Sequence, residues 1–173
     1  MRLLFTTIAV FLFLCVLIGA GIAWVGRRAP VEFQVEMSAD IKARPEIVWA
    51  ALTNISTLPD RDDDISEVEL LEADQEGPLR WKVVRGDTSV MIYRRQVAEP
   101  YQRLVLVIDG GNMGIEGSFR YDLRPTDQGT SLTVVEQSQV QDLMLRAAFA
   151  LAGGRDQVLR AQLAEIKEVS EAQ

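Results

Sequence analysis

The order of apolar and polar positions along the chain predicts a sheet that a C-terminal helix covers. Over residues 31–37 apolar and polar side chains alternate, which predicts a strand, and a short helix is predicted at Pro45–Thr53. Turn residues then separate six further strand-like runs, at Val68–Ala73, Leu79–Arg85, Ser89–Val97, Arg103–Ile108, Ile115–Leu123 and Ser131–Val140. A helical tail follows from about Gln141. Because a sheet of hairpins buries only one face unaided, we expect an α+β domain in which one long helix covers about seven antiparallel strands and encloses an apolar space.

Alternation within the strands assigns some side chains to that enclosed space. The sixth strand carries five small or apolar residues on one face, and these are Ile115, Gly117, Phe119, Tyr121 and Leu123. Trp81 is assigned to the same face, whereas the faces of the fourth strand, with Tyr93, and of the seventh, with Glu136, stay open. The side chains that we expect to contact a ligand are those of Trp81, Tyr93, Phe119, Tyr121 and Glu136. For Glu136 two interpretations remain, an ion pair with an arginine such as Arg94 or Arg120, or a role in orienting a ligand.

The helical tail changes character halfway along its length. Leu143–Ala152 is apolar nearly all round, and Gly153-Gly154 then interrupts the helical pattern. Beyond the glycines, Leu159, Leu163 and Ile166 form one apolar stripe. The apolar first half is expected to pack on the sheet; a lid over a pocket, or a surface that touches a bilayer, is the alternative.

An uncharged apolar run, Leu3–Val25, precedes the domain. It is long enough to cross a bilayer, which takes about 20 residues, and longer than the roughly 7–15 apolar residues of a cleaved signal peptide. We therefore predict a single-pass transmembrane anchor over residues 1–28 and one domain over residues 29–173, with no apolar contact between them. Positive charge at the two flanks is nearly equal and slightly favours a cytoplasmic domain, so the side stays open.

Composition restricts the chemistry of the domain. Net charge −7 and pI 4.7 argue against binding nucleic acid, and the chain has no histidine. The only cysteine, Cys15, lies inside the apolar run. We therefore assign no catalytic residue, metal ligand or cofactor, and expect a monomer. Asp60, Asp62 and Asp64 imitate the start of a calcium loop, but Ile65 stands where that loop needs glycine, so a solvated acidic loop is expected.

Two segments resemble the START-like superfamily, which includes the polyketide cyclase/dehydrase and lipid-transport proteins and the Bet v 1-like allergens. Pro45-Glu46-Ile47-Val48-Trp49, continuing to Thr53, resembles the first small helix of that group, with Pro45 as start signal and Trp49 as a core anchor. Residues 129–136 resemble its last strand. The resemblance extends over about residues 31–169. It implies a helix-grip fold, in which a curved antiparallel sheet wraps around a long C-terminal helix and leaves a cavity for a hydrophobic molecule.

These observations predict a membrane-anchored binding or carrier domain for a hydrophobic small molecule or lipid. Two alternatives remain. One is a polyketide cyclase- or aromatase-like enzyme in which Glu136 or Tyr121 moves a proton. The other is a non-catalytic interaction module whose cavity is filled by its own side chains.

Overall fold

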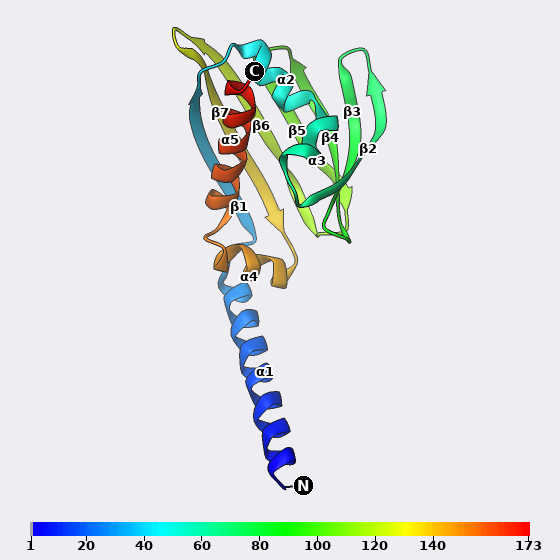
Figure 1. Cartoon of the computed structure of the whole chain (residues 1–173), viewed down its shortest axis with the longest axis vertical. Helices are drawn as coiled ribbons and strands as arrows, with labels where there is room; N and C mark the ends of the chain where they lie inside the picture. The colour runs from blue at the N-terminus through cyan, green and yellow to red at the C-terminus, as the bar shows by residue number, and fades with distance from the viewer. Residues whose placement is uncertain (1) are drawn as a thin grey trace.

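The computed structural model describes residues 2–173, and its described side chains begin at Thr7. The helices are α1 (Arg2–Arg28), α2 (Pro45–Thr53), α3 (Leu58–Arg61), α4 (Leu143–Leu151) and α5 (Arg155–Glu171), with a short 3-10 turn, η1 (Ile55–Thr57), between α2 and α3. The strands are β1 (Glu32–Ile41), β2 (Ile65–Asp74), β3 (Gly77–Arg85), β4 (Ser89–Glu99), β5 (Arg103–Gly111), β6 (Ile115–Thr126) and β7 (Gly129–Val140). Figure 1 shows α1 projecting from one end of a domain in which a twisted sheet curves around α5.

All seven strands form one antiparallel sheet in the order β1-β7-β6-β5-β4-β3-β2. Strands β2 to β7 are joined by tight turns, so each pairs with its neighbour in sequence. The first strand pairs instead with the last, from Glu32 opposite Gln139 to Ile41 opposite Thr130. This long-range pairing joins the first strand to the rest of the sheet. The seven strands and the α+β class are as the sequence predicted.

The core lies between the sheet and the helices α2 and α5. Val48 of α2 and Leu159, Leu163 and Ile166 of α5 are buried against the inward residues of the strands. Pro45 begins α2, as its fixed φ and missing N–H favour. Trp49 is only half-buried and meets the ring of Tyr101 edge-on at 6.1 Å, so Val48 is the better-buried anchor of this helix.

The C-terminal tail is two helices that meet at the predicted interruption, and α5 is the long helix that the sheet wraps around. Gly153 and Gly154 have φ angles of 92° and 83°, which residues other than glycine rarely adopt. The chain turns there between α4 and α5. Only α5 lies on the sheet. Helix α4 packs mainly against the last turns of α1. The expectations that Leu143–Ala152 packs on the sheet and that no apolar contact joins residues 1–28 to the domain are therefore both wrong.

The segment Val10–Arg28 of α1 is long and apolar enough to span a membrane by length and composition, and almost all of it is exposed. The sequence predicted the anchor from Leu3–Val25. The side chains of residues 3–6 in that run lie outside the part of the chain whose side chains the structure describes.

The free edge of the sheet on the far side from β1 is β2. Its pairing with β3 is irregular, with register shifts at Ile65/Glu67, Leu70/Glu72 and Glu72/Ala73. Four carboxylates lie along this strand, those of Glu67, Glu69, Glu72 and Asp74. Lys82 of β3 contacts the first two of them, with its Nζ 3.3 Å from Glu67.

Candidate functional site

Three aromatic rings from different strands meet on the face of the sheet that α5 covers. The register pairs Trp81 of β3 with Tyr93 of β4, and their rings stack at 5.9 Å. Tyr93 in turn lies 6.5 Å from the ring of Phe119 on β6. The inward orientation of Trp81 and Phe119 is as the sequence predicted. For Tyr93, whose orientation the sequence left open, the structure places the ring on the same inward face.

Tyr121 lies two residues beyond Phe119 on the same face and carries a polar group into this interior. The amide nitrogen of Gln162 on α5 donates a hydrogen bond of 2.9 Å to the Tyr121 hydroxyl oxygen. Burial raises the pKa of Tyr121 well above its usual range, and burial likewise raises the pKa of Tyr93. Both phenols therefore stay protonated at neutral pH and are suited to donating hydrogen bonds.

Glu136 is the most deeply buried charged group of the interior, with 0% of its surface exposed. Its Oε1 accepts hydrogen bonds from Arg155 Nε at 2.8 Å and from Ser138 Oγ at 2.7 Å, and Arg155 Nη2 also contacts it. Oε2 has no hydrogen-bond partner among the described residues. The seventh strand thus turns Leu132, Val134 and Glu136 inward, which settles the face that alternation left open.

The partner of Glu136 is therefore Arg155, and the expectation of Arg94 or Arg120 is wrong. Both of those arginines point to the other face, where they pair with Asp109 and Asp122. Arg155 begins α5, and its guanidinium also lies 4.6 Å from the ring centre of Phe149 on α4. No pattern within β7 indicates this partner, because it comes from a helix that starts after the Gly153–Gly154 turn.

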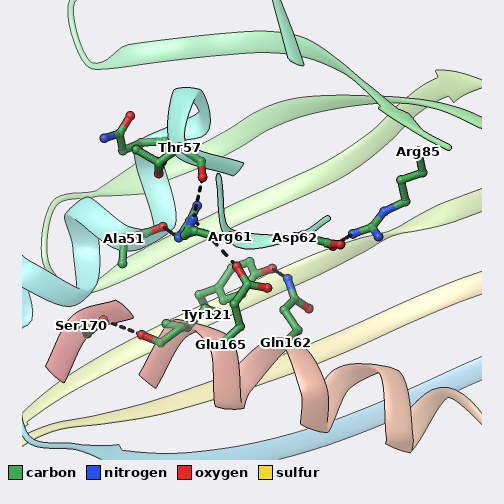
Figure 2. A network of polar contacts seen from close by, with 11 residues as sticks. Ala51, Thr57, Arg61, Asp62, Arg85, Tyr121, Gln162, Glu165 and Ser170 are labelled. Carbon is green, nitrogen blue, oxygen red and sulfur yellow. Dashed lines mark hydrogen bonds and ion pairs between the residues drawn. The ribbon is translucent and has the colours of Figure 1, made fainter. Parts of the chain in front are cut away.

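A polar network holds α3 at the rim of the interior (Figure 2). The Nη1 of Arg61 donates to the carbonyl of Ala51 at 2.9 Å, and its Nε lies 3.8 Å from Glu165 on α5. Asp62 pairs with Arg85 of β3 at 2.6 Å. Burial raises the pKa of Glu165, with the nearby Arg61 acting in the opposite direction. The predicted solvated acidic loop is thus partly a short helix, and Asp62 is tied to the sheet.

Two hollows of very different size lie against the sheet. A void of about 10 Å³ lies next to Trp81, lined also by Leu52, Thr53, Pro78, Arg95, Leu104 and Leu106. A void of that size holds about one water molecule. A second hollow, of about 670 Å³, is open to solvent and involves mainly outward polar residues of β1, β6 and β7, such as Gln34, Glu116 and Gln137. Within the described residues, no group of three or more His, Cys, Asp or Glu side chains is placed to hold a metal ion.

Comparisons with known proteins agree with this architecture. The sequence model of the family described as polyketide cyclase / dehydrase and lipid transport matches residues 32–171. No curated protein sequence matches the chain. Among solved structures, the Zhui aromatase/cyclase from Streptomyces sp. R1128 gives a TM-score of 0.68 at 16% identity, over 81% of this chain and 94% of that one. A START superfamily protein from Mycobacterium smegmatis gives 0.61 at 14% identity, over 80% of this chain and 94% of that one. At such identities the likeness is one of fold, and it confirms the predicted helix-grip arrangement.

Proposed function

The chain belongs to the polyketide cyclase/dehydrase and lipid transport family, and from this we propose that it binds a hydrophobic small molecule or lipid between α5 and the sheet, at a membrane in which α1 anchors it. The domain boundary after residue 28 is part of this proposal. The anchor would keep the binding site near the bilayer, which raises the effective concentration of ligands that come from lipid.

The observation that carries the proposal is the mixture of groups beneath α5. Ligand sites are mostly apolar and aromatic, with a few placed polar groups that fix orientation. Here the rings of Trp81 and Tyr93 stack and that of Phe119 lies next to Tyr93 at a tilt, while Tyr121 supplies a buried hydroxyl. Glu136 adds a buried carboxylate oxygen with no partner among the described residues. A ligand with an apolar body and a hydroxyl group would satisfy both kinds of neighbour.

A ligand that enters beside Trp81 has to displace side chains, because the void there holds about one water molecule. We place the entrance at α3, since that helix has only four residues and no buried residue of its own. Leu58 packs against the core, and the other attachments of α3 are the polar contacts of Arg61 and of the following residue, Asp62.

The test is photo-crosslinking in the membrane. The full chain in nanodiscs is exposed to diazirine analogues of a fatty acid and of a sterol, and the labelled peptides are identified by mass spectrometry. We expect label on β6 and α5, and Phe119→Ala should change its yield strongly. Ser118→Ala is the matched control, because Ser118 lies on the opposite face of the same strand and should leave the yield unchanged. Label confined to α1 and α4 would refute a ligand site in the interior.

A second candidate is favoured by one specific observation, the small size of the void beside Trp81. In that case the domain is a non-catalytic interaction module, and the aromatic rings only pack. Absence of interior label with both probes supports this candidate.

A cyclase-like reaction is less well supported by the arrangement of the polar groups. Glu136 already accepts hydrogen bonds from Arg155 and Ser138, and burial keeps the Tyr121 phenol protonated. A general base must be able to take up a proton near neutral pH, which a phenol of raised pKa does not favour. Tyr121 is thus better suited to orienting a ligand than to removing a proton from it.

A further inference from the structure

Helix α4 carries an exposed apolar stripe that neither the sheet nor α1 covers. Met144, Ala148 and Leu151 stand at positions i, i+4 and i+7, which places them on one side of the helix. Met144 is 56% exposed and Leu151 67%. Ala147, three residues from Met144 and four from Leu151, lies beside this stripe and is fully buried within the molecule, so the stripe borders the side of α4 that packs internally. Large exposed apolar side chains on one helix face indicate a contact surface.

The position of α4 indicates what covers this stripe. The helix lies across the domain end of α1, as Figure 1 shows. The approach is close, because a Cβ atom at Gly26 of α1 would lie 2.2 Å from the carbonyl oxygen of Leu143. In any membrane that α1 spans, helix α4 therefore lies at the same depth along the membrane normal as Gly26.

That height corresponds to the lipid headgroups. A span that begins at Leu3 crosses roughly 30 Å of hydrocarbon in about 20 residues, which ends near Ala23. The headgroup layer beyond it is roughly 5–7 Å thick, or about four to five helical residues. Trp24, Gly26 and Arg28 fall in this stretch, and the Arg28 guanidinium lies 4.4 Å from the Trp24 ring centre. A tryptophan with basic neighbours is typical of a membrane–water interface.

Charge at this end of the molecule also suits a membrane surface, although the domain is acidic overall. Arg27 and Arg28 end α1, and Arg146 lies within α4. The nearby carboxylate of Asp142 is engaged in capping α4, where it accepts a hydrogen bond of 2.7 Å from the Leu145 N–H.

We infer that α4 is an interfacial helix, lying in the headgroup layer with Met144, Ala148 and Leu151 in contact with the acyl chains. The inference rests on the proposed anchoring by α1. The domain would then be held at a fixed orientation on the bilayer, because α4 is joined to it on both sides, through Asp142 to β7 and through Gly153–Gly154 to α5. The lipid surface is the occupant that we propose. The experiment distinguishes it from a second copy of the chain or another protein.

The test is the accessibility of single nitroxide labels on the full chain in nanodiscs made of equal parts phosphatidylcholine and phosphatidylglycerol. In a Cys15→Ser background, cysteine replaces Met144, Ala148 or Leu151 in turn, and Asp156, exposed on α5, serves as the aqueous control. A label on the native Cys15 in the unaltered chain reports the anchor separately. Collision with oxygen, which concentrates in lipid, is compared with collision with a water-soluble nickel chelate.

We expect an oxygen-to-nickel ratio several-fold higher at residues 144, 148 and 151 than at residue 156, and a high ratio at Cys15. A high ratio at Cys15 with aqueous ratios along the stripe would overturn the inference and leave the anchor standing. Protection of the stripe from both reagents would show a protein partner or a second copy in place of lipid, and would overturn it as well. An aqueous ratio at Cys15 would instead remove the anchor on which both proposals depend.

Discussion

Replacing Arg155 with methionine tests how far the interior of the domain depends on its buried ion pair. The side chains of Arg155 and Glu136 are 8% and 1% exposed. The substitution removes two hydrogen bonds to Glu136 Oε1 and leaves only the bond from Ser138 Oγ, while Oε2 has no partner among the described residues to begin with. Removing one partner of a buried pair leaves an uncompensated charge, so we expect a loss of about 3–5 kcal/mol in the free energy of unfolding.

Two further variants separate the charge from other effects. Arg103→Met removes an arginine that pairs with Asp122 at 2.6 Å but is 47% exposed, and it should lower the stability far less than Arg155→Met. The double substitution Glu136→Leu with Arg155→Met replaces the pair by apolar side chains, and its stability should return to within about 1 kcal/mol of the original protein.

The assay is urea unfolding of the full chain in mild detergent micelles, followed by tryptophan fluorescence and far-UV circular dichroism. For a chain of this length, a loss of 3–5 kcal/mol lowers the melting temperature by roughly 6–20 °C. The reasoning is refuted if Arg155→Met costs no more than Arg103→Met. It is equally refuted if the double variant is as unstable as the single one, because the buried charge would then not be the cause.

Two other outcomes follow from the site and from the junction with α1. Tyr121→Phe should cost about 1 kcal/mol at neutral pH through the lost bond to Gln162. Because burial raises the pKa of Tyr121, its contribution is complete below the unfolded value of about 10 and is lost as the pH rises above it. Urea midpoints of wild type and Tyr121→Phe should therefore converge in the alkaline range, and parallel curves would contradict this account. A protein lacking residues 1–28 should keep slow amide hydrogen exchange in the sheet and α5 but lose it in α4, whose partner Gly26 is gone; aggregation under all mild conditions would show that the division into anchor and domain is wrong.

The fold could be predicted from the sequence because its main determinants are local. Alternation on β6 places Phe119 and Tyr121 inward, and turn residues separate the strands that pair with their sequence neighbours. The pairing of β1 with β7 joins residues about 100 positions apart, and no local pattern in the sequence predicts it. The break at Gly153–Gly154 was visible as two glycines, but their sequence does not give the direction in which α4 leaves the sheet.

The candidate site was predicted in part, for similar physical reasons. Trp81, Phe119 and Tyr121 were assigned by strand period alone, and their burial confirms that placement. Their role in binding a ligand stays a prediction. Gln162 and Arg155 were missed, because the rotation of α5 about its own axis decides which of its polar residues faces the sheet. Leu159, Leu163 and Ile166 do give that rotation, and a helical projection through them indicates that Gln162 lies beside the apolar stripe.

Under the proposed anchoring by α1, the irregular edge strand β2 has a consequence for copies of the domain on one membrane surface. Copies held in one plane meet far more often than copies in solution, and an unpaired strand edge offers its N–H and C=O groups to the strand of a neighbour. The three register shifts of β2 break the regular spacing that such pairing needs, and the carboxylates of Glu67, Glu69 and Glu72 place charge along the same edge. Lateral growth of the sheet from one copy into the next is thereby prevented, so a high density of these domains on one membrane remains compatible with separate, folded units.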